Sequence, residues 1–94
     1  MLEKCKAAMR IRTTAYDSEI EELIVAALAD LGIAGVLHTD EAADHPLIRR
    51  AVVTYVRLHF GTPDDYDRLK ASYDEQKAQL QTSRAYTQFG EAGA

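Results

Sequence analysis

An apolar stripe at helical spacing constrains the fold of this chain more than any other feature of its sequence. Within residues 17–32, apolar side chains recur every three or four positions, at Ile20, Leu23, Ile24, Ala27, Leu28 and Leu31. This period matches the turn of an α-helix and places the six side chains on one side of it. Thr14 and Asp17 have the spacing of a capping box, which predicts the start of this helix, and Gly32 can end it.

Turn-forming residues divide the rest of the chain into three further helical blocks. We expect a short helix over residues 2–10, an apolar one over 46–60 and a last one over 64–81. The helix over 46–60 has apolar side chains on nearly every side, which is typical of the central helix of a bundle. The fold class is therefore all-α, a small four-helix bundle-like domain, and its predicted core includes Ile24, Leu28, Leu31, Val52, Tyr55 and Val56.

Proline and glycine residues predict where the last two helices begin and end. Pro46 fits the first position of a helix, where no N–H is needed, and Gly61 fits the stop. Thr62 is expected to cap the final helix, with Pro63 as its first residue.

Two segments lack helical periodicity. Residues 35–45 are polar and predict a variable connecting loop, with room for a small hairpin. Residues 83–94 predict a flexible C-terminal tail whose aromatic side chains are Tyr86 and Phe89. The predicted organisation is one domain over residues 1–82 followed by this tail.

Composition narrows the class of protein. The chain has 94 residues, 47% of them apolar, and a net charge of −4, which indicates one globular domain and disfavours sequence-independent DNA binding by a monomer. Its single cysteine, Cys5, cannot form an internal disulfide, so we expect an intracellular chain with Cys5 packed in the core. No leader peptide is visible, and no apolar run is long enough to span a membrane.

No pattern in the sequence predicts catalysis, a cofactor or a metal. The potential metal ligands of one loop have no common ligand spacing and are read as a solvated acidic segment: His38, Asp40, Glu41, Asp44 and His45. The acids Asp64, Asp65 and Asp67 are better explained by a helix N-terminus than by acid–base chemistry. Phosphate loops, nucleophile elbows and HExxH motifs are missing. We expect a protein that is not an enzyme.

Charge is divided between the predicted helices. Residues 1–12 carry +3, residues 17–31 carry −5 and residues 46–60 carry +3. Neighbouring helices of one subunit could neutralise one another, or complementary edges could join copies of the chain head to tail. The sequence leaves both interpretations open. The second predicts a subunit interface that includes Arg49, Arg50, Arg57, Glu19 and Glu22.

Three segments in a fixed order carry a family pattern. The first holds Asp17, Ile20, Leu23, Ile24 and Ala27; the second holds His45, Pro46, Leu47, Ile48, Ala51, Val52, Tyr55, Val56, Phe60 and Gly61; the third holds Tyr66, Leu69, Tyr73, Lys77 and Leu80. With the short N-terminal helix, this order resembles the small head–tail connector proteins of tailed bacteriophages and prophages. Such proteins are also labelled adaptor, head-completion or possible DNA-packaging proteins. The resemblance covers about residues 2–82.

The resemblance implies a structural role in the virion. Such a protein assembles in the cytoplasm of the bacterial host as a ring, commonly of twelve copies, beneath the portal protein. The ring extends the DNA channel, through which DNA passes without sequence-specific binding, and presents a surface to the next head-completion or tail protein. The resemblance also implies that the C-terminal tail, with Tyr86 and Phe89, reaches the portal.

Two other classes compete with this interpretation. A small helical protein–protein interaction module unrelated to virion assembly fits the composition equally well. A helical DNA-binding regulator is disfavoured, because the acidic segment 35–45 is too long for a tight turn and the helix after it is too apolar to read a DNA groove.

Overall fold

The computed structural model describes residues 1–32 and 44–82, and every regular element in these ranges is a helix. The helices are α1 (Leu2–Met9), α2 (Asp17–Asp30), α4 (Pro46–His59) and α5 (Tyr66–Thr82). The all-α prediction is confirmed, and each predicted helix exists within a few residues of its expected bounds. The predicted loop over 35–45, apart from its last two residues, and the predicted tail over 83–94 lie outside the described residues.

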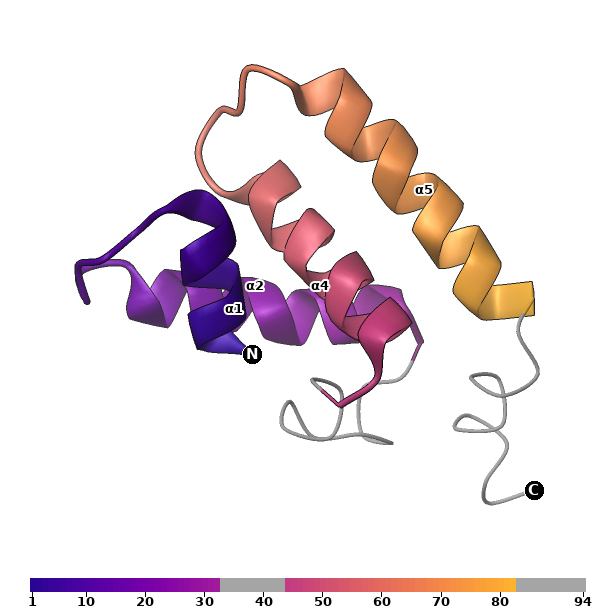
Figure 1. Ribbon diagram of the computed structural model, residues 1–94, viewed down its shortest axis with the longest axis horizontal. Helices are drawn as coiled ribbons and strands as arrows, with labels where there is room; N and C mark the ends of the chain where they lie inside the picture. Colours follow the sequence, from indigo (N-terminus) through magenta and orange to yellow (C-terminus); the bar gives the residue numbers. More distant parts are fainter. Residues whose placement is uncertain (33–43, 83–94) are drawn as a thin grey trace.

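The other three helices pack around α4. In Figure 1, α1 and α4 cross in front of α2, and α5 runs beside α4. Helix α4 contacts each of the other three helices, as its apolar composition predicts. Helices α2 and α4 therefore meet through their apolar sides, and their charged sides point elsewhere.

The core draws side chains from all four helices. In α4, Ala51, Val52 and Val56 are fully buried, and Ile20 and Ala27 of α2 are equally inaccessible. The predicted core positions Ile24, Leu28, Leu31, Val52 and Val56 are confirmed. The prediction for Tyr55 is wrong.

Tyr55 is only half-buried and packs against the edge of the core. Its ring lies 5.4 Å from the ring of Tyr73 and 4.2 Å from that of His59, between centroids. A tyrosine carries a hydroxyl that favours a position at the boundary with water, which explains why helical spacing alone overestimated its burial.

Three turn residues act as predicted. Pro46 opens α4 directly after His45. Gly32 and Gly61 follow α2 and α4 with φ angles of 78° and 67°, a region that glycine occupies without strain.

The predicted caps of two helices are wrong, although α2 begins at Asp17 as predicted. Helix α2 begins at Asp17 and has no side-chain cap, because Thr14 accepts the Asp17 N–H through its backbone carbonyl. Helix α5 begins at Tyr66 rather than at Pro63, and the carbonyl of Asp65 accepts the first helical hydrogen bond, from the N–H of Leu69 at 2.9 Å. Asp65, a residue type favoured before a helix, therefore takes the place expected for Thr62.

Helix α1 docks on the bundle through one side. Cys5 is fully buried, as predicted for a packing cysteine, and this burial raises the pKa of its thiol to about 11. Such a thiol stays protonated and unreactive near neutral pH. Leu2 and Met9 pack against the core beside it.

Candidate assembly surfaces

A basic groove lies between α4 and α5. It encloses about 360 Å³, and Lys4 of α1 completes its wall. In the described part of the chain, its lining holds five cationic side chains and no carboxylate, with apolar and polar groups between them. We define the basic groove by the residues Lys4, Arg49, Arg50, Val53, Thr54, Arg57, Arg68, Leu69, Ser72 and Gln76.

The sequence of α4 explains why cations gather in the groove. This helix contains three arginines and no acid. Arg49, Arg50, Val53 and Arg57 follow one another at intervals of one, three and four residues, which places them on one face of the helix. The core side of the same helix holds the fully buried residues Ala51, Val52 and Val56.

Neighbouring groups orient several groove residues. The hydroxyl of Thr54 donates a hydrogen bond of 2.9 Å to the carbonyl of Arg50, one turn earlier. The guanidinium of Arg68 donates to the carboxylate of Asp65. This hydrogen bond, assisted by the charges of Arg68 and Arg57, holds the pKa of Asp65 below its usual range.

The wall contributed by α5 carries an unused hydrogen-bond acceptor. Gln76 donates through its amide nitrogen to the hydroxyl of Ser72 at 3.4 Å, whereas its buried oxygen Oε1 has no partner in the described part of the chain. The groove continues past Gln76 into a smaller hollow that also contains Glu75. The groove is therefore cationic in its middle and carries one acid at that edge.

An acidic face lies on the side of α2 that points away from the core. Helix α2 contains five acids and no base. We define the acidic face by its exposed residues Glu19, Glu21, Glu22 and Val25. Among residues 1–32 and 44–82, no ion pair engages these three glutamates. Val25 is 59% exposed, which is unusual for a large apolar side chain in the middle of a helix.

The first residue of α2 is paired within the chain. Asp17 Oδ1 lies 2.8 Å from the ammonium nitrogen of Lys6 on α1. Lys6 is only 7% exposed. Asp17 Oδ1 makes no well-directed hydrogen bond with any described residue, so the contact is an ion pair rather than a directional bond. It joins α1 to the beginning of α2 at the boundary of the core.

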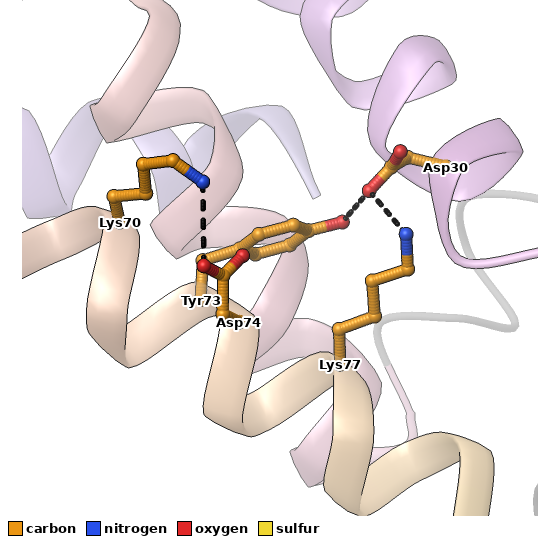
Figure 2. Close-up of polar contacts among 5 residues, drawn as sticks. All are labelled: Asp30, Lys70, Tyr73, Asp74 and Lys77. Atoms are coloured by element: carbon orange, nitrogen blue, oxygen red, sulfur yellow. Dashed lines mark hydrogen bonds and ion pairs between the residues drawn. The ribbon is translucent and has the colours of Figure 1, made fainter.

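The last residue of α2 is paired as well. The carboxylate of Asp30 accepts a hydrogen bond from the hydroxyl of Tyr73 and lies 3.3 Å from the ammonium nitrogen of Lys77 (Figure 2). Both partners belong to α5, so this cluster ties α5 to the end of α2. Lys70 and Asp74 form a separate ion pair of 3.3 Å along α5.

Asp30 and Tyr73 shift each other's pKa. The hydrogen bond from Tyr73, followed by that from Lys77, lowers the pKa of Asp30. Burial, followed by the hydrogen bond to Asp30, raises the pKa of Tyr73. At neutral pH the carboxylate is therefore charged and the phenol is protonated, which is the combination that the hydrogen bond requires.

The structure separates the predicted interface residues into two groups. Arg49, Arg50 and Arg57 all line the basic groove, and Glu19 and Glu22 lie on the acidic face. Whether these surfaces form a subunit interface stays a prediction. Sequence reasoning did not include Lys4, Arg68 and Val25, because no spacing within one helix relates these three residues to the arginines of α4.

Other predicted positions fall partly outside the described residues. This holds for Tyr86 and Phe89 of the tail and for His38, Asp40 and Glu41 of the loop. In the parts of the chain that the structure describes, no three His, Cys, Asp or Glu side chains gather as a metal site would require. No helix in these same parts combines the length and apolar character needed to cross a membrane.

The fold and its surfaces define a small helical protein with two outer surfaces of opposite charge. A protein-family model described as phage connector protein matches residues 1–87. Because this match covers most of the chain, the chain belongs to the phage connector protein family. The matched segment contains Tyr86 and ends before Phe89. Comparison with curated proteins and with solved structures found no significant match.

Proposed function

We propose that this protein is a structural head–tail connector that forms a ring under the portal of a phage head. The ring extends the channel for DNA and joins the head to the next head-completion or tail protein. The observation that carries this proposal is the family match over residues 1–87. The protein acts by assembly rather than by catalysis and becomes part of the virion.

The distribution of charge supports assembly into a ring. A subunit of a closed ring needs two different contact surfaces, one for each neighbour. The basic groove and the acidic face lie on different helices and carry opposite charge. A net charge of −4 also suits a channel through which DNA slides without adhering.

The most direct test adds the purified protein to DNA-filled heads that carry a portal and lack tails. We expect electron microscopy to show rings bound at the portal vertex and tails joining after their addition. Light scattering of the protein alone measures whether rings form before the portal is present. A protein that neither assembles nor binds portals would instead support the small interaction module unrelated to virions.

The proposed contact with the portal is the C-terminal tail. Aromatic side chains such as Tyr86 and Phe89 are favoured anchors where a chain segment docks on a partner. Deleting residues 83–94 is expected to leave the melting temperature nearly unchanged and to abolish binding to portal-bearing heads. Replacing only Tyr86 and Phe89 with Ala should reproduce most of the loss. Full binding by the truncated chain would place the docking surface on the helices.

A further inference from the structure

The basic groove is an incomplete surface. Its five cationic side chains come from three helices, and among the described residues no carboxylate lines the space that they face. Of these five, Arg68 is paired with Asp65, whereas Arg50 makes no ion pair with any described residue. Like charges that converge in this way repel one another unless an acidic group comes between them. Two grooves of this kind cannot face each other for the same reason.

The acidic face has the complementary composition. Glu22 and Val25 are one turn apart on α2, and both are exposed. Glu19 and Glu21 flank them. The face thus offers three negative charges around one exposed apolar side chain. The groove offers cations around the half-buried Val53.

We propose that the acidic face of one copy docks into the basic groove of the next copy of this chain. The glutamates of α2 then lie against Arg50 and Arg57, and Val25 packs on Val53. The inference rests on the proposed function, because it names the contact by which the ring is built. Since the two surfaces differ, the contact repeats head to tail and closes into a ring or continues as a filament.

A second copy of the chain fits the groove better than DNA does. A DNA-binding surface offers cations to phosphates and commonly accompanies an overall positive charge, whereas this chain has a net charge of −4. A neighbouring DNA strand would also approach the glutamates of α2 on the same small domain. Duplex DNA therefore serves as the competing ligand in the test.

The test uses two variants of the full chain, each with one surface disabled. The groove variant carries Arg50→Glu and Arg57→Glu, and the face variant carries Glu22→Gln and Val25→Asn, which remove a charge and an apolar side chain without adding a charge. Each should weaken self-association, measured by sedimentation velocity, by at least about tenfold. Arg12→Glu reverses an exposed charge outside both surfaces and should leave association unchanged. Circular dichroism and the melting temperature confirm that all variants are folded.

Mixing the two variants gives the decisive readout. The groove variant keeps its acidic face and the face variant keeps its groove, so each mixed pair has one intact contact. The other possible contact would bring the altered face against a groove in which two of the five cations have become glutamates. We therefore expect an equimolar mixture to form dimers that do not grow. Larger assemblies in the mixture, or no association at all, would overturn the inference.

Other outcomes separate this inference from the proposed function. Rings that survive the groove substitutions overturn the docking contact and leave the connector function standing. A wild type that assembles as inferred and fails to join heads to tails overturns the function and leaves the contact standing. A wild type that is monomeric up to about 1 mM, the weakest range of useful affinity, overturns the contact. So does duplex DNA binding that the groove substitutions abolish while assembly is unaffected.

Discussion

The two ends of α2 and its middle use the same kind of side chain in different ways. At the ends, Asp17 and Asp30 are paired with Lys6 and with Tyr73 and Lys77 of other helices. Between these two residues, in the N-terminal half of α2, the glutamates of the acidic face are exposed, and no described residue forms an ion pair with them. The acids at the ends join α2 to other helices of the same subunit, and we propose that the glutamates between them contact a neighbouring copy.

This difference bears on the two interpretations of the charge pattern. Pairing within one subunit explains the acids at the ends of α2, which face α1 and α5. Among the described residues, no ion pair joins Arg50 or Arg57 of α4 to an acid of α2. The intramolecular interpretation thus accounts for the termini of one helix. Contact between copies of the chain stays our proposal for the exposed glutamates of α2 and the arginines of α4.

The largest expected effect comes from placing a charge in the contact between α2 and α4. Val52 is fully buried, so Val52→Asp puts an unpaired carboxylate in the core and should prevent folding. Val25→Asp is the matched control, because it makes the same change on the exposed side of α2. Far-ultraviolet circular dichroism should show lost helicity only for Val52→Asp. A helical Val52→Asp variant would contradict the position of α4 at the centre of the bundle.

The next effect tests the pair at the start of α2. Lys6→Met keeps the apolar stem of the side chain and removes its charge, leaving Asp17 without its partner. We expect a loss of about 2 kcal/mol in the free energy of unfolding, below the value for fully buried pairs because Asp17 is partly exposed. Lys4→Met, the same change at an exposed position of α1, should cost less than about 0.5 kcal/mol. Urea titration measures both, and equal losses would remove the special role of Lys6.

A smaller effect is expected at the end of α2. Tyr73→Phe keeps the buried ring and removes the hydroxyl that donates to Asp30, and the carboxylate retains Lys77. A hydrogen bond to a charged group contributes about 1.5 kcal/mol, so we expect the unfolding free energy to fall by that amount. Tyr66→Phe removes a hydroxyl from an exposed ring of the same helix and is the control. If both substitutions lower the free energy of unfolding equally, the contact between Tyr73 and Asp30 does not stabilise the fold.

The smallest expected effect in this series is on how the free energy of unfolding depends on pH. The folded chain holds the pKa of Asp30 below 3.8, the ordinary value, chiefly through the hydrogen bond from Tyr73. A carboxyl with a depressed pKa stabilises the fold fully above its unfolded pKa, and this contribution is lost as the pH falls through the folded pKa. Wild-type stability should therefore fall more steeply below about pH 5 than that of Asp30→Asn. Parallel curves would show that Asp30 is not linked to folding.

Local sequence signals predicted the helices well and their polar contacts poorly. The apolar period fixed α2, and Pro46, Gly32 and Gly61 marked ends that depend only on backbone angles. The start of α5 was misplaced because Thr62 and Asp65 are both favoured capping residues, and the backbone selects between them. Pairing such as that of Asp30 with Tyr73, 43 positions apart, depends on how helices cross, which no local spacing contains.

The residues of the basic groove likewise fall into those that the sequence predicted and those that it did not. The arginines of α4 could be recognised because they share one helix and lack a neighbouring acid. Lys4 and Arg68 join them only after α1 and α5 have packed against α4. Burial of Lys6 was also unforeseen, since a lysine in a short helix is ordinarily an exposed residue, and its pairing with Asp17 requires α1 to fold back onto α2.

One measurement compares the middle and the end of α2 directly, by reversing one charge in each. Glu22→Lys and Asp30→Lys are each studied by urea titration and by sedimentation velocity at low salt. We predict that Glu22→Lys leaves the unfolding free energy within about 0.5 kcal/mol of wild type and weakens self-association. Asp30→Lys should instead lower the unfolding free energy by more than about 1 kcal/mol and leave the association of the folded chain unchanged. If Glu22→Lys unfolds the protein, or if Asp30→Lys alone disrupts assembly, the division of α2 into folding ends and an assembling middle is wrong.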